Sequence, residues 1–178
     1  MTHILRTMAA MLLLVTFGGS LMTGQDSVAA EIKEDGGIRD HSDPDASKRI
    51  HSREIAGLAV RFWLWDEAGG QGSWYVCEIG KSNDAVFFLT MSGGAKGSVR
   101  VDAAFLGKLQ QLIEQHGLVR LNGISQTTSG LPVEFSPCSL TVDYASGERL
   151  YFCLDNDPEA EWAKAMRRLF LQALAEGA

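Results

Sequence analysis

The stretch DAAFLGKLQQLIEQHG (residues 102–117) decides the fold class, because here the hydrophobic pattern acquires a helical period. Asp102 is expected to be the N-cap of this helix, and Gly117 is expected to end it in the left-handed conformation at the C′ position. Gly107 costs the helix about 1 kcal/mol relative to alanine, so we expect it to mark a close approach to the sheet. The apolar stripe consists of Phe105, Leu106, Leu109, Leu112 and Ile113, followed by His116.

Strand-like runs precede this helix. Residues 58–65 (LAVRFWLW), 73–79 (SWYVCEI) and 85–91 (AVFFLTM) are rich in β-branched and aromatic residues and are separated by turns. Residues 98–101 predict a short fourth strand. The first part of the domain is therefore expected to be a sheet.

A hairpin and a second helix follow. Residues 138–144 alternate between apolar and polar side chains, and a turn at Ser146 and Gly147 leads into a partner strand over 149–154. Asp157 and Pro158 predict the start of the last helix. Its apolar stripe consists of Trp162, Met166, Leu169, Phe170, Ala173 and Leu174. This order predicts an α+β fold, with an antiparallel sheet of about five or six strands and two amphipathic helices packed on one face.

The N-terminus is typical of a secretory signal peptide over residues 1–30. Arg6 supplies the positive charge, residues 8–17 (MAAMLLLVTF) are uncharged, and small residues precede Glu31. The apolar run is shorter than the roughly 20 residues that span a bilayer. We therefore expect export to the periplasm or the extracellular space, without stable membrane insertion after cleavage; a retained N-terminal anchor is the alternative.

Residues 31–54 are densely charged and lack aromatic side chains, which predicts a disordered tether. The single folded domain is then expected over residues 55–178. The chain carries 16 Lys+Arg against 22 Asp+Glu among its 178 residues, a net charge of −6. This balance excludes a general nucleic-acid binder and disfavours docking on anionic lipid.

Export permits disulfides, and the chain has three cysteines. A two-residue turn at 146–147 places Cys138 and Cys153 on the same face of the hairpin, so we expect a bridge between them; two buried thiols are the alternative. Cys77 is expected to be a small buried hydrophobe.

Three segments resemble known catalytic or metal-binding motifs, but each lacks an essential feature of its motif. The sequence GKS at 80–82 lacks the preceding glycine of a phosphate-binding loop, and GISQT at 123–127 lacks the last glycine of a nucleophile elbow. The acidic run at 155–161 lacks the spacing of a calcium loop and is explained by the dipole of the following helix. His116 has no evident second or third ligand, and a pair with Cys77 has no spacing to support it. We expect no metal, no cofactor and no catalytic residue.

Two features favour binding. Trp63 and Trp65 share a strand face, and Trp74 can join them in an aromatic platform; a strand buried on both faces is the alternative. The 16-residue stretch 122–137 is a long polar loop, in which Gln126, Thr127 and Thr128 are candidate ligand contacts. It can also be a covering loop with Leu131 and Phe135 in the core.

These features predict a non-enzymatic secreted or periplasmic binding module for a protein, peptide or glycan. The alternative is a small secreted hydrolase that uses His116, or a carboxylate pair such as Glu134 and Asp143, in a cleft. A third interpretation makes the last helix a self-association surface.

Overall fold

The structure, a computed structural model, describes residues 37–66, 70–82 and 86–177; the expected signal peptide lies outside the described residues. The elements in chain order are β1 (Ile38–Asp40), β2 (Ile55–Trp65), β3 (Gly72–Lys81), β4 (Phe87–Gly93), β5 (Gly97–Val101), α1 (Ala103–Gln115), η1 (Leu118–Leu121), β6 (Ser125–Thr128), η2 (Val133–Phe135), β7 (Cys138–Tyr144), β8 (Arg149–Leu154) and α2 (Glu161–Glu176).

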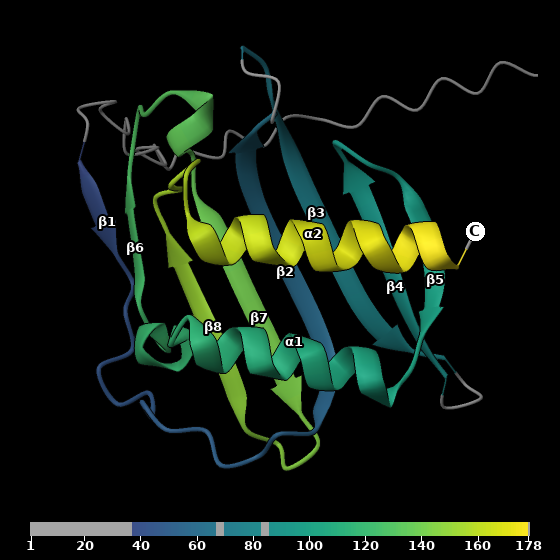
Figure 1. The fold of residues 1–178 in the computed structure, drawn as a ribbon. Helices are drawn as coiled ribbons and strands as arrows, with labels where there is room; N and C mark the ends of the chain where they lie inside the picture. The colour runs from purple at the N-terminus through teal and green to yellow at the C-terminus, as the bar shows by residue number, and fades with distance from the viewer. Residues whose placement is uncertain (1–36, 67–69, 83–85, 178) are drawn as a thin grey trace, which may run out of the picture. The chain divides into compact units, whose positions relative to one another are not determined.

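The described strands form one sheet of eight, in the order β1-β6-β8-β7-β2-β3-β4-β5. Neighbouring strands are antiparallel except β6 and β8, which run parallel. Both α-helices lie on the same face of this sheet (Figure 1). The α+β class is thus confirmed, but the expected five or six strands are too few, because β1 and β6 are short and polar and carry no apolar alternation.

The core lies between the helices and the facing side of the sheet. In β7 every second side chain is buried, as the alternating sequence pattern predicts. The largest fully buried side chains are Phe62, Phe152, Phe170, Ile55, Leu64, Leu89, Leu109, Ile113, Leu118, Leu140, Leu150 and Met166.

Helix α1 begins as predicted. The Asp102 carboxylate accepts a hydrogen bond from the Phe105 amide at 2.9 Å, and Gly117 adopts a φ of 61° after the helix. The interpretation of Gly107 is wrong: a Cβ there would meet no atom within 4 Å, since this position is exposed rather than pressed against the sheet.

Helix α2 begins later than predicted, at Glu161 rather than Pro158, with Ala160 at the N-cap. Asp157 forms a local turn instead, in which its carboxylate accepts the Glu159 amide at 2.9 Å.

The expected disordered tether is replaced, over residues 37–54, by a segment that lies along the domain. β1 pairs with β6, and the chain then runs below β8 and β7 to reach β2 (Figure 1). Composition reflects only the apolar surface that a segment can bury, whereas this segment is held by backbone and polar side-chain hydrogen bonds. Within the described residues, no helix is long and apolar enough to cross a membrane.

Candidate functional site

The sheet face away from α1 and α2 has no helix over it in the described part of the chain (Figure 1). Alternate residues of β2 point to this open face, among them Arg61, Trp63 and Trp65. The neighbouring strand β3 adds Trp74, which lies opposite Trp63. The open face therefore holds the predicted aromatic residues.

The three tryptophans differ in exposure. Trp63 is only 5% exposed, while Trp65 is 39% exposed and Trp74 is half-buried. The rings of Trp63 and Trp65 meet edge to face with their centroids 4.4 Å apart, and the Arg61 guanidinium carbon lies 4.0 Å from the centroid of Trp74. Trp63 is therefore a buried support, contrary to the expected platform, and Trp65 is the exposed ring.

Asn156, which is 3% exposed, fixes this end of β2. Its side chain accepts from the Trp63 amide at 3.0 Å and donates to the Trp63 carbonyl at 2.9 Å. The side chain also donates to the Glu134 carbonyl at 2.6 Å, and the backbone amide of Asn156 donates to the Phe135 carbonyl at 3.2 Å. Asn156 thus ties η2 to β2 beyond Arg61, where the pairing of β2 with β7 ends.

Apolar side chains are exposed to solvent near the contact between β2 and η2. Leu131, Val133 and Phe135 are 36%, 55% and 41% exposed, so Leu131 and Phe135 are not the core residues of a covering loop. Trp65 follows Trp63 by two residues on the strand that η2 contacts. We call the set Trp65, Leu131, Val133 and Phe135 the Trp65 surface.

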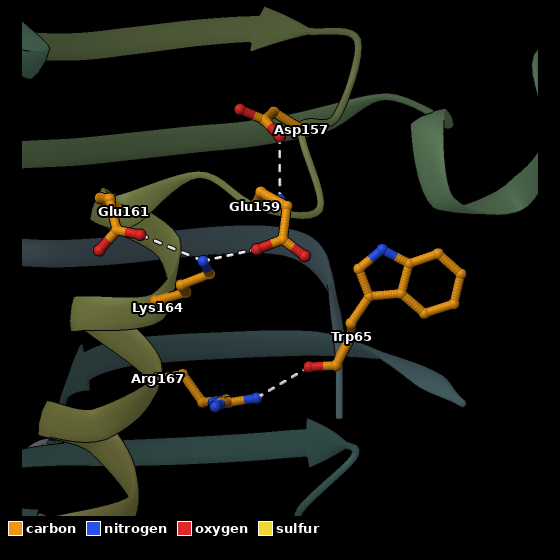
Figure 2. Close-up of polar contacts among 6 residues, drawn as sticks. All are labelled: Trp65, Asp157, Glu159, Glu161, Lys164 and Arg167. Carbon is orange, nitrogen blue, oxygen red and sulfur yellow. Dashed lines mark hydrogen bonds and ion pairs between the residues drawn. The ribbon is translucent and has the colours of Figure 1, made fainter. Parts of the chain in front are cut away.

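Figure 2 shows how Trp65 is held. The Arg167 guanidinium of α2 donates to the Trp65 carbonyl at 3.3 Å, while the indole points away from α2. The backbone of Trp65 is therefore fixed from the helix side and its ring is presented on the other side.

Gln126, Thr127 and Thr128 lie apart from the tryptophans. They belong to β6, which is separated from β2 by β8 and β7. Three strand spacings amount to about 14 Å. The Thr128 amide donates to the Asp155 carboxylate at 2.7 Å. The structure therefore does not join these residues and the tryptophans in one site.

The expected disulfide is absent, since Cys77, Cys138 and Cys153 are free thiols. Cys138 pairs with Leu154 and Ser139 pairs with Cys153, which puts the two cysteines on opposite faces of the hairpin. The Tyr144 carbonyl accepts from the Gly147 amide at 2.9 Å, and Gly147 has a φ of 85°, so the loop has three residues rather than two. Because side chains alternate between faces, this one-residue difference in register reverses which residues of the two strands share a face.

The candidate acids are also dispersed. Asp143 lies near the end of β7, where its carboxylate pairs with Arg149 at 2.6 Å, whereas Glu134 precedes the start of β7. Glu159 and Glu161 both contact the Lys164 ammonium, at 2.6 and 3.1 Å (Figure 2). Among the described residues no three His, Cys, Asp or Glu side chains form a metal-binding group.

His116 lines a cavity of about 330 Å³ that it shares with Cys138. Burial raises the pKa of the Cys138 thiol to about 12, so the thiolate needed for nucleophilic attack is disfavoured there. Cys138 is therefore not activated as a nucleophile in this cavity.

A groove of about 680 Å³ lies between the open face and residues 41–52, which we call the N-terminal strap. Its walls combine charged, imidazole and aromatic side chains; they include His41, Asp43, Arg49, His51, Glu148, Arg149 and Tyr151. We call it the strap groove. Sequence reasoning missed it because His41 and His51 lie in the segment expected to be disordered.

Comparison of the chain with protein-family models, curated proteins and solved structures finds no match. The geometry of the open face therefore carries the functional interpretation.

Proposed function

We propose that this protein is an exported, non-enzymatic binding module that holds a partner protein through the Trp65 surface. The observation that carries the proposal is the grouping of four exposed apolar side chains at the junction of β2 and η2. Isolated exposed apolar residues need no explanation, but a group around a tryptophan is typical of an interface.

The surface is supported from beneath, which favours binding without a large ordering cost. Asn156 ties η2 to β2, Arg167 holds the Trp65 carbonyl, and Trp63 supports the indole edge to face. Rigid presentation of an aromatic anchor is the arrangement found in interface hot spots.

A protein partner fits this surface better than a glycan. Within the Trp65 surface, the side chains of Leu131, Val133 and Phe135 offer no hydrogen bonds. Sugars are held by aromatic stacking together with polar groups, whereas a patch of aromatic and aliphatic side chains matches the apolar centre of a protein interface.

The test compares partner capture by four tagged, exported forms: the wild type, Trp65→Ser, Val133→Ser and Phe88→Ser. Phe88 is the matched control, because it is 41% exposed on the same face but lies on β4 opposite Gly80, far from the Gly72 end of β3 that pairs with Trp65. Cross-linking in intact cells followed by mass spectrometry should recover the same protein with the wild type and Phe88→Ser, and lose it with the other two.

Capture that survives both Trp65→Ser and Val133→Ser would contradict the proposal. Thermal unfolding of each variant establishes that it is folded. The same samples test export, since we expect a mature N-terminus near Glu31; full-length precursor retained in the cytoplasm would contradict export.

A further inference from the structure

The strap groove is built on two fixed ends. At one end, the Asn122 side chain donates to the Ser47 carbonyl at 2.8 Å and accepts from the Tyr151 amide at 2.7 Å. The neighbouring Gly123 carbonyl accepts from the Asp43 amide at 2.7 Å. Gly123 has a φ of 77°, and a Cβ there would collide with Ala46. A glycine is therefore required for the strap to lie this close to the sheet.

At the other end, both oxygens of Glu148 are occupied. One accepts from the His51 amide at 2.8 Å, and the other accepts from the Ser52 amide at 2.9 Å and from the Ser146 hydroxyl at 2.8 Å. Because the strap is attached at both ends, the groove is preformed. Its volume of about 680 Å³ is within the usual range of small-molecule sites.

Two guanidinium groups, those of Arg49 and Arg149, line this groove. The Arg49 guanidinium has no hydrogen-bond or ion-pair partner among the described residues, and Arg149 uses its Nε on Asp143, which leaves its terminal nitrogens available. The carboxylate of Glu148 already accepts three hydrogen bonds, and that of Asp43 accepts from the Asp45 amide with one oxygen. The groove therefore favours a ligand that brings its own acceptors.

The remaining groups define the body of that ligand. Tyr151 is 39% exposed, and its ring lines the groove with Ile50 and Ala46. An aromatic face of this kind stacks on a sugar ring, and the second oxygen of Asp43 can accept from a sugar hydroxyl.

We propose that the strap groove binds a small sugar-like molecule that carries an oxyanion, either a carboxylate or a phosphate. Arg49 and Arg149 bind the oxyanion, Tyr151 lies against the ring, and Asp43 accepts from a hydroxyl. This site is on the same open face as the Trp65 surface but is formed by other residues, and it does not depend on the proposed partner protein.

The test is calorimetric titration of the mature protein with glucuronate, glucose 6-phosphate, glucose and inorganic phosphate. We expect at least one of the two charged sugars to bind with a Kd below about 1 mM. Glucose and inorganic phosphate should each bind at least tenfold more weakly than that sugar, because each lacks half of the contacts. Inorganic phosphate binding as tightly as the charged sugars would mean a simple anion site and would overturn the sugar-like ligand.

Variants distinguish the groove from nonspecific charge. Arg49→Gln and Arg149→Gln should each weaken binding by about 10- to 100-fold, as expected for loss of a hydrogen bond to a charged group. Arg168→Gln, on the exposed side of α2, is the matched control and should leave the Kd unchanged. Equal weakening in all three variants would overturn the assignment to the groove.

Asn122→Ala tests the strap itself. It should abolish binding and raise hydrogen exchange in residues 41–52, whereas Arg49→Gln should weaken binding by about 10- to 100-fold without that increase. If no probe binds with a Kd below about 1 mM, the proposal is wrong, whatever the outcome for the Trp65 surface.

Discussion

The Asn156 side chain takes the place of a neighbouring strand for Trp63. Its oxygen accepts from the Trp63 amide and its nitrogen donates to the Trp63 carbonyl, at 3.0 and 2.9 Å, so one side chain completes the backbone pairing where β7 ends. Both partners are buried, at 3% and 5% exposure. Buried backbone groups without partners are costly, which makes this amide a stability determinant.

We therefore expect Asn156→Ala to lower the free energy of unfolding by about 3 kcal/mol, since it leaves two buried backbone groups of Trp63 unpaired. Urea denaturation followed by circular dichroism measures this. Gln172→Ala, which removes an exposed amide from α2, is the control and should change stability by less than about 0.5 kcal/mol. Equal stability of Asn156→Ala and wild type would mean that water replaces the amide.

Gly107→Ala should raise stability by about 1 kcal/mol, because alanine is the better helix former and the added Cβ meets no neighbour within 4 Å. Gly93→Ala should instead lower stability, because Gly93 has a φ of 100° and a Cβ there would collide with the Trp74 carbonyl. Thermal unfolding should show a higher melting temperature for Gly107→Ala and a lower one for Gly93→Ala than for the wild type. Destabilisation by Gly107→Ala would indicate that the exposed helix surface is packed against something.

The unreduced protein should contain three thiols and no bridge between Cys138 and Cys153. Burial raises the pKa of both Cys77 and Cys138 to about 12, and the less buried Cys153 has a raised pKa for the same reason. Alkylation at pH 8 should therefore label Cys153 first and the other two only after unfolding. Mass spectrometry reads the order; a cross-linked peptide joining Cys138 and Cys153 would contradict the register of the hairpin.

Attachment of the strap should weaken in acid. Backbone hydrogen bonds from His51 and Ser52 lower the pKa of Glu148 in the folded state. A lowered folded-state pKa means that the stabilisation is complete above the ordinary glutamate pKa and is lost as the pH falls through the folded value. Hydrogen exchange at the His51 and Ser52 amides should accordingly rise in that range relative to β2.

Glu148→Gln should remove most of this pH dependence, and Glu78→Gln, at an exposed carboxylate on β3, should not. An identical acid response in Glu148→Gln and wild type would exclude the carboxylate as the group that releases the strap.

The sequence predicted those parts of the fold that depend on local signals. The Asp102 cap and the apolar stripe of α1 are both present, as is the alternation in β7, because each reflects a period that a single element imposes. The hairpin register could not be predicted, since a two-residue and a three-residue loop both accommodate Ser146 and Gly147. Only the strand pairing distinguishes them: Asp143 lies opposite Arg149, and the Tyr144 amide donates to the Glu148 carbonyl.

The candidate site was predicted in part, for a related reason. The position of Trp65 on an open face follows from strand alternation, but the burial of Trp63 depends on contacts formed at long range, through Asn156 and η2. The strap groove left no hydrophobic signal, because residues 41–52 are held by Asn122, Gly123 and Glu148 rather than by an apolar stripe.

The pairing of β1 with β6 bears on where this protein can be cut. A fragment starting at Ile55, the point where strand-like residues begin, would leave one side of β6 with bare amides and carbonyls, which are a template for strands from other molecules. Residues 37–54 therefore cover the edge of β6 and protect it from aggregation, so truncated forms of the protein should begin no later than Gly37.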